Sequence, residues 1–112
     1  MKKILLFAIT VLLLSACAVK APYQDHTGPG GVLMVQAGQH VAAGEDAKAI
    51  ALLERAVRIE PRNGHAWLGL ARLYFASGDI NKAEQFARRA MQFAGADKRL
   101  ERDCQAFIGE IR

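Results

Sequence analysis

Apolar and polar residues alternate at a helical period through most of the chain, and the C-terminal segment shows this most clearly. Between Lys98 and Ile111 the apolar positions follow one another at steps of four, three, one and three, which places them on one face of an α-helix. These positions are Leu100, Cys104, Phe107, Ile108 and Ile111, and the other face carries Lys98, Arg99, Arg102, Asp103 and Glu110. The pattern predicts an amphipathic helix over about 98–111.

The preceding residues repeat at a fixed distance along the chain. When residues 30–63 are laid over 64–97, a shift of 34 residues, eight positions are identical without a gap. The identical pairs are Gly30 with Gly64, Ala37 with Ala71, Ala42 with Ala76, Gly44 with Gly78, Lys48 with Lys82, Ala49 with Ala83, Arg55 with Arg89 and Ala56 with Ala90. Self-similarity at such a period is typical of tandem helical repeats.

Each repeat reads as helix, turn and helix. Gly44 and Gly78 stand at the two turns, where a helix commonly ends in a left-handed residue that glycine adopts at low cost. Pro61 ends the second helix of the first unit near residue 59, and Asn63 can cap a helix over about 64–77. A further helix is expected over about 80–94, and Asp97 can cap the last helix. The predicted fold class is therefore all-α.

The second unit carries the motif Trp67-x-x-Leu70-Ala71-x-x-Tyr74, followed by Gly78-Asp79 and by small residues at Ala83, Ala87 and Ala90. This motif resembles the tetratricopeptide repeat. The first unit matches it through Leu33, Ala37, Gly44, Ala49, Leu53, Ala56 and Pro61, but Gln36 and His40 replace the usual Leu and Tyr, and Gly95 replaces a common Pro in the second unit. The resemblance implies a short α-solenoid over 32–112, with two helical hairpins and a C-terminal capping helix.

The resemblance also implies a concave groove that binds a partner, lined by the first helix of each unit. Carried over by position, its side chains are Met34, Val35, Val41, His65, Leu68, Arg72 and Phe75, with Arg99 and Arg102 from the last helix. An apolar floor flanked by arginines suits a peptide that carries acidic residues. The alternative is that Val41, Leu68 and Phe75 belong to the core and that the arginines are solvated. The carboxylate clamp of chaperone-binding repeats is not expected, because Met34, Gly38 and Gly69 occupy its positions.

The N-terminus has the layout of a secretory signal peptide over 1–16. Lys2 and Lys3 precede an apolar run of 11 residues, which is shorter than the roughly 20 that a membrane-spanning helix needs. Leu14-Ser15-Ala16-Cys17 resembles the lipobox of bacterial lipoproteins, which implies lipid attachment at Cys17. Residues 17–31, rich in Pro and Gly, are expected to form the lipidated cysteine and a flexible tether. The alternative is an ordinary secretory peptide with a chance cysteine.

The net charge and the positions of the histidines and of Cys104 exclude several classes of function. Loss of Lys2 and Lys3 with the signal peptide lowers the formal net charge from +4 to +2, which does not indicate nucleic acid binding. His26, His40 and His65 do not have the spacing of a metal site. Cys104 lies on an apolar stripe and is expected to be buried rather than nucleophilic. We therefore expect neither an enzyme nor a cofactor-binding protein.

The resulting hypothesis is a lipid-anchored adaptor of the Gram-negative envelope that binds a segment of another envelope protein. Ala18 after the lipidated cysteine implies sorting to the outer membrane, facing the periplasm. Small lipoproteins with such repeats include activators of peptidoglycan synthases, and the resemblance makes this role the first expectation. The alternative is a pilotin-like factor that assembles a pilus or secretion secretin. Two repeats fall short of the about three that a continuous core needs, so a homodimer is also possible.

Overall fold

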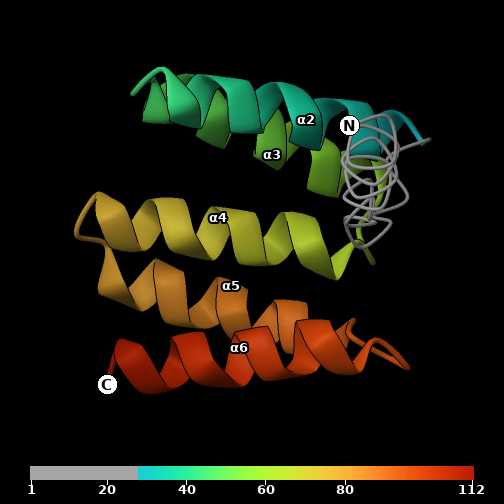
Figure 1. The fold of residues 1–112 in the computed structure, drawn as a ribbon, viewed down its shortest axis with the longest axis vertical. Coiled ribbons are helices and arrows are strands. Elements are labelled where there is room, and N and C mark those ends of the chain that lie inside the picture. The colour runs from blue at the N-terminus through green and yellow to red at the C-terminus, as the bar shows by residue number, and fades with distance from the viewer. Residues whose placement is uncertain (1–27) are drawn as a thin grey trace, which may run out of the picture.

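The computed structural model describes residues 28–112, which form a stack of helices without strands (Figure 1). The helices are α2 (Pro29–Ala42), α3 (Asp46–Ile59), α4 (Gly64–Ala76), α5 (Ile80–Gln92) and α6 (Lys98–Glu110). From α3 onward, the predicted helix ends agree with the structure to within two residues. The predicted signal peptide, Cys17 and the tether up to residue 27 lie outside the described residues. No helix between Pro29 and Glu110 is both long and apolar enough to cross a bilayer.

The helices pair into two antiparallel hairpins, α2 with α3 and α4 with α5 (Figure 1). Gly44 and Gly78 close the two hairpins with φ angles of 74° and 88°, a region where side chains are strained, which explains the glycine at both turns. Asn63 caps α4 as predicted, and Asp79 caps α5 in the same way. Their side-chain oxygens accept hydrogen bonds from the backbone N–H groups of Ala66 at 3.2 Å and Lys82 at 3.1 Å.

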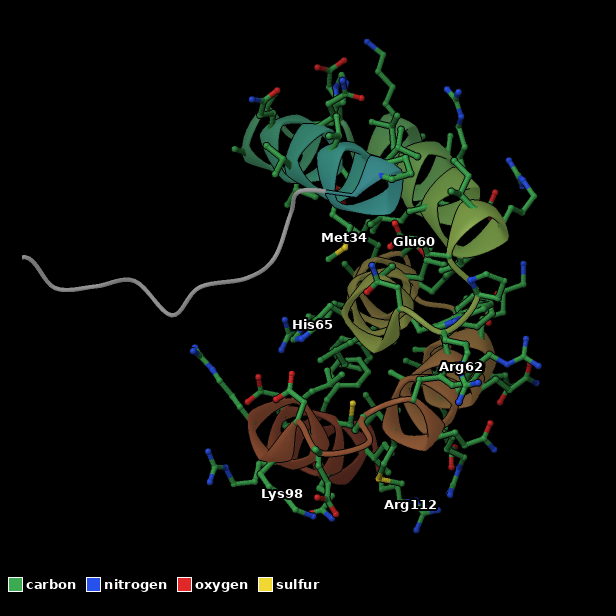
Figure 2. The ribbon with its side chains drawn as sticks, turned by 90° about the vertical axis from the view of Figure 1, so that its right-hand side faces the viewer. Met34, Glu60, Arg62, His65, Lys98 and Arg112 are labelled. Carbon is green, nitrogen blue, oxygen red and sulfur yellow. The ribbon has the colours of Figure 1, made fainter. Side chains whose placement is uncertain are left out.

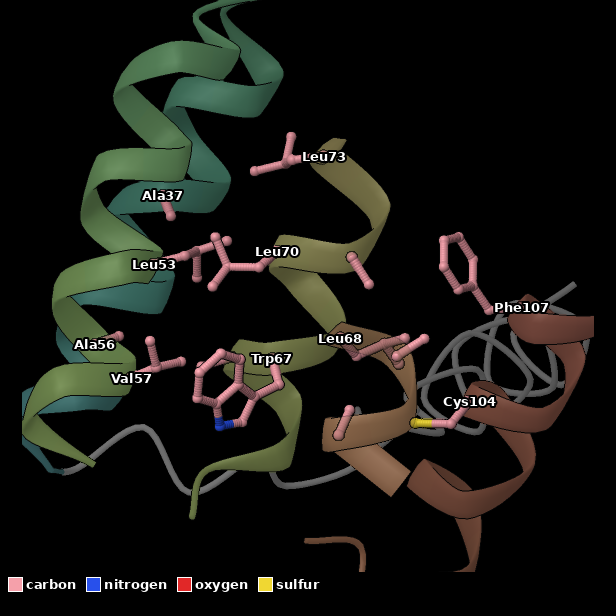
Figure 3. Packing of buried hydrophobic residues seen from close by; sticks show 14 of the residues in the cluster. Ala37, Leu53, Ala56, Val57, Trp67, Leu68, Leu70, Leu73, Cys104 and Phe107 are labelled. Carbon is pink, nitrogen blue, oxygen red and sulfur yellow. The ribbon is translucent and has the colours of Figure 1, made fainter. Parts of the chain in front are cut away.

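Small residues let the two helices of each hairpin approach closely. Ala49 and Ala56 in the first hairpin, and Ala83 and Ala90 in the second, are completely buried. Trp67 fills the space beside them, where its ring packs against Phe86 of α5 at 5.5 Å between centroids. The indole N–H donates to the carbonyl of Pro61 at 2.8 Å, so its one polar group is satisfied. Figure 3 shows this core as a continuous layer between the hairpins and α6.

Successive units stack through equivalent positions of their first helices. Ala66, Leu70 and Leu73 of α4 are buried, and so are Leu100, Cys104 and Phe107, which occupy the same positions in α6. In α2 these positions hold Val32, Gln36 and Gln39, which are exposed. The polar glutamines thus form one end of the stack, and α6 covers the other. This arrangement confirms the predicted short α-solenoid with a C-terminal capping helix.

The first helix begins at Pro29, three residues before the predicted start of the repeat domain at residue 32. Proline is compatible with the first turn of a helix because its missing N–H has no intrahelical partner there. The N–H of Gly30 donates instead to the Glu60 carboxylate, 30 residues away in sequence. The density of Pro and Gly predicted that residues 29–31 belong to the tether. They form the first turn of α2 instead, where Glu60 bonds to the Gly30 N–H.

Candidate functional site

Helices α2, α4 and α6 form a curved row on one side of the stack, with α3 and α5 on the other (Figure 2). We call the surface of α2, α4 and α6 that is turned away from α3 and α5 the inner face, and the surface of α3 and α5 the outer face. In Figure 2, Met34 and His65 lie on the inner side and Arg62 on the outer side. Met34 and His65 belong to the set of residues that the sequence predicted for partner binding.

The part of the inner face on α2 is apolar. No residue from Pro29 to Ala42 carries a formal charge at neutral pH, apart from protonation of His40. Val41 is 44% exposed and lies seven residues, or two turns, after Met34, on the same side of the helix. Val35 is 46% exposed, but it occupies the position of Gly69 in α4, which faces Leu53 of the preceding hairpin, so in α2 it belongs to the open end of the stack and not to the inner face. Met34 is half-buried against the core, and its Sδ accepts a hydrogen bond from Asn63 Nδ2 at 3.4 Å. A partner on α2 would therefore meet aliphatic surface without displacing an ion pair.

The part on α4 and α6 combines an aromatic ring with cations. Phe75 is 39% exposed, and the rest of its ring packs edge-on against Phe107 of α6 at 5.7 Å between centroids. Arg72, Arg99 and Arg102 are exposed. Burial raises the pKa of the Cys104 thiol, Asp103 raises it further, and the positive charge of Arg72 opposes both. Arg72 of α4 therefore acts electrostatically on the Cys104 thiol of α6.

His65 is joined to the start of α6 by a contact that the sequence did not predict. Its Nε2 lies 2.9 Å from Asp97 Oδ2, while Asp97 Oδ1 caps α6 by accepting from the Leu100 N–H at 3.0 Å. Both hydrogen bonds hold the pKa of the Asp97 carboxyl below its ordinary range, and the bond from the Leu100 N–H has a larger effect than the bond with His65. The sequence predicted Asp97 as the cap of α6. It did not predict the contact with His65, because the two residues are 32 positions apart and no local pattern connects them.

Leu68 does not belong to the accessible surface, which corrects its assignment to the groove. Only 3% of the residue is exposed, and it lies in the core between α4 and the last two helices (Figure 3). The reason is the capping helix, which covers on α4 the face that the next unit would cover in a longer solenoid. Substitution of Leu68 would therefore report on folding rather than on partner binding.

The remaining predicted residues give the inner face two zones. Met34 and Val41, two turns apart, form an aliphatic zone at α2, and Arg72, Arg99 and Arg102 contribute cations at α4 and α6. Residues 28–112 contain no cluster of three or more His, Cys, Asp or Glu side chains that could hold a metal ion. An extended surface with an apolar and a cationic zone is suited to recognising a protein segment that has apolar and acidic residues.

Comparison with known proteins places the fold in a family. The profile of the tetratricopeptide repeat matches residues 35–102. The globular C-terminal domain of P. aeruginosa LpoP is similar in structure, with a TM-score of 0.73 and 34% sequence identity, over 80% of this chain and 83% of that chain. No curated protein sequence matches the chain. The length of the profile match and the agreement of the helical hairpins show that the chain belongs to the tetratricopeptide repeat family.

Proposed function

We propose that this protein is a non-catalytic adaptor that is anchored by lipid at Cys17 to the outer membrane and faces the periplasm. Its inner face binds a segment of an envelope protein, and the partner is a peptidoglycan synthase whose activity rises on binding. The tetratricopeptide repeat fold supports the interaction role, because stacked helical hairpins present an extended surface to a partner.

The observation that carries the binding site is the charge-free surface of α2 beside the cations of α4 and α6. Exposed Val41 and half-buried Met34 are available to a partner, and burying them costs no desolvation of charge. Arg72 can then pair with a carboxylate of the same segment, and arginine does so with two parallel hydrogen bonds. Protein interfaces combine an apolar centre with arginines in this way.

The anchoring part of the proposal is supported by the lipobox and by the domain order. The repeat domain follows an N-terminal segment that resembles a lipoprotein signal and tether, and the similar domain of LpoP is likewise C-terminal in its protein. A Cys17→Ser chain should lose incorporation of labelled palmitate and should leave the membrane fraction. Retention of both would remove the lipid anchor from the proposal.

The partner is tested by co-purification of the full chain with detergent-solubilised peptidoglycan synthases from the same organism, together with a glycosyltransferase assay. The variants are Val41→Glu and Arg72→Glu, which change exposed residues of the inner face. Both should reduce co-purification and the increase in synthase rate. Gln36→Glu is the matched control, because it introduces a carboxylate at an exposed position on another face of α2 and should retain both.

Several outcomes would overturn parts of this proposal. Absence of binding and of a rate change with the unmodified chain excludes the synthase role, and loss of secretin multimers on gene deletion would favour a pilotin-like role instead. Binding that survives both Val41→Glu and Arg72→Glu would show that the inner face is not the site. A dimer in sedimentation that Val41→Glu dissociates would identify a second copy as the occupant of the inner face.

A further inference from the structure

The outer face carries arginines that the proposed function does not use. Arg55 and Arg58 lie three residues apart on α3, so both project from the same side of the helix. Arg62 follows four residues after Arg58, beyond the end of α3, and Arg89 belongs to α5. All four residues are exposed, and none of them has an ion-pair partner within the described part of the chain.

Trp67 connects the arginines of the two hairpins. Its indole N–H donates to the carbonyl of Pro61, the residue before Arg62. The Arg89 guanidinium lies over the same indole ring, with its central carbon 4.9 Å from the ring centroid. This cation–π contact holds Arg89 next to the loop that carries Arg62. The arginines of α3 and α5 therefore form one surface around the single tryptophan of the fold.

The acidic residues nearby bond to other groups and form no ion pair with these four arginines. Glu54 accepts a hydrogen bond from the Tyr74 hydroxyl at 2.8 Å, and Glu60 accepts from Gly30 N–H and from Asn63. Glu84 is paired with Arg88 at 2.6 Å and with Arg112 at 3.2 Å. We define the outer arginine surface as Arg55, Arg58, Arg62 and Arg89.

We propose that the outer arginine surface is a second docking surface, which binds an acidic segment of a protein partner while the inner face stays free. Charge complementarity carries the proposal, because four arginines without carboxylate partners face solvent on one side. Arginine rather than lysine predominates there, and its planar fork matches carboxylates with two hydrogen bonds. Arginine is also enriched among the residues that dominate binding at protein interfaces.

An anionic membrane is the competing partner, and the structure favours it less. Surface binding to a bilayer usually combines cations with apolar side chains that insert between the lipids. The large apolar residues exposed near this surface are Ile59, at the end of α3, and Ile80, at the start of α5. The two helices run in the same direction, so the end of α3 and the start of α5 lie on opposite sides of the molecule along the helix axes (Figure 1). They cannot form one inserting patch with the arginines.

The test uses the full chain and a fluorescent decaglutamate peptide, with binding followed by anisotropy at low salt. The double variant Arg58→Glu and Arg62→Glu should weaken binding by about tenfold or more. The matched control is Lys48→Glu with Lys98→Glu, which makes the same change in charge at exposed positions outside both the outer arginine surface and the inner face, and should keep most of the affinity. Helix content by circular dichroism must be the same in all three proteins, which the exposure of these side chains leads us to expect.

Two results would overturn the proposal. One is equal weakening in both double variants, because binding would then depend on net charge rather than on the outer arginine surface. The other is the absence of decaglutamate binding together with binding to phosphatidylglycerol vesicles that Arg58→Glu and Arg62→Glu abolish, which would assign the surface to the membrane. Neither measurement involves a peptidoglycan synthase, so the outcome is separate from that of the proposed function.

Discussion

Glu60 Oε1 accepts a hydrogen bond from the backbone N–H of Gly30 at 3.0 Å, which joins the end of α3 to the first turn of α2. The N-cap residue of α2 is Gly28, which has no side chain to provide such a bond. Glu60 takes over this role from a distant part of the sequence, and its negative charge is favourable at a helix N-terminus. Its other oxygen accepts from Asn63 Nδ2, the residue that caps α4. The Glu60 carboxylate thus connects the start of α2 with the start of α4.

Glu60→Ala should therefore loosen the first turn of α2. We expect a loss of about 1 kcal/mol in the free energy of unfolding, typical of a lost N-cap, and faster hydrogen exchange at Gly30. The control is Glu101→Ala, which removes only an exposed pair with Lys98 and should change stability by a few tenths of a kcal/mol at most. Unchanged exchange at Gly30 in Glu60→Ala would contradict the capping role.

Two helical glycines should respond in opposite directions to substitution by alanine. A Cβ at Gly64 would lie 2.7 Å from Leu100 Cδ2 and 2.9 Å from the carbonyl oxygen of Ala90, so we expect Gly64→Ala to destabilise by about 1–3 kcal/mol. A Cβ at Gly38 meets nothing within 4 Å, so Gly38→Ala should stabilise α2 by about 0.5–1 kcal/mol. Urea midpoints that shift in the same direction for both variants would disprove the close packing at Gly64.

The Cys104 thiol should be protected in the folded chain. It is completely buried, and in a Cys17→Ser background we expect it to react with a thiol reagent only after unfolding. Cys104→Ser should cost about 1–3 kcal/mol, because a hydroxyl would be buried without a partner. Fast labelling of the native Cys17→Ser chain would show that α6 does not cover this position.

The stability of the chain should also depend on the Cys104 thiol at alkaline pH. Its pKa is raised by burial, so the folded state keeps the proton at a pH where the unfolded state has lost it. The stabilisation is complete below the thiol pKa of the unfolded chain, about 8.5, and is lost as the pH rises through the folded value. Urea titrations from about pH 7 to about pH 10 should show a smaller decline in stability for Cys104→Ala than for the unmodified chain.

Asp97 should contribute to the acid sensitivity of the fold. Its pKa is lowered by the Leu100 N–H and by His65, so its stabilisation is present above the unfolded value of about 3.9 and is lost as the pH falls through the lower folded value. Asp97→Asn keeps a residue that can cap α6 but removes this titration. Because Asp97 is exposed, the difference at acidic pH should amount to a few tenths of a kcal/mol. Identical acid unfolding curves for both proteins would refute this role.

The periodicity of the sequence by itself determined the repeat architecture. Gly44 and Gly78 fixed the turns because few residues accept a positive φ, and Asn63, Asp79 and Asp97 fixed the helix starts because their side chains bond to nearby N–H groups. Each of these signals acts over a few residues, so it can be read locally.

The tertiary structure alone decided which residues of the predicted site are accessible. Leu68 has the spacing of a surface residue on α4, but α6 folds over it and leaves Val35, Val41 and Phe75 exposed. The contacts of Glu60 with Gly30 and of His65 with Asp97 join positions 30 and 32 residues apart. Helical spacing states which side chains share a face, whereas burial depends on which distant segment covers that face, and only the stacking of the hairpins determines this.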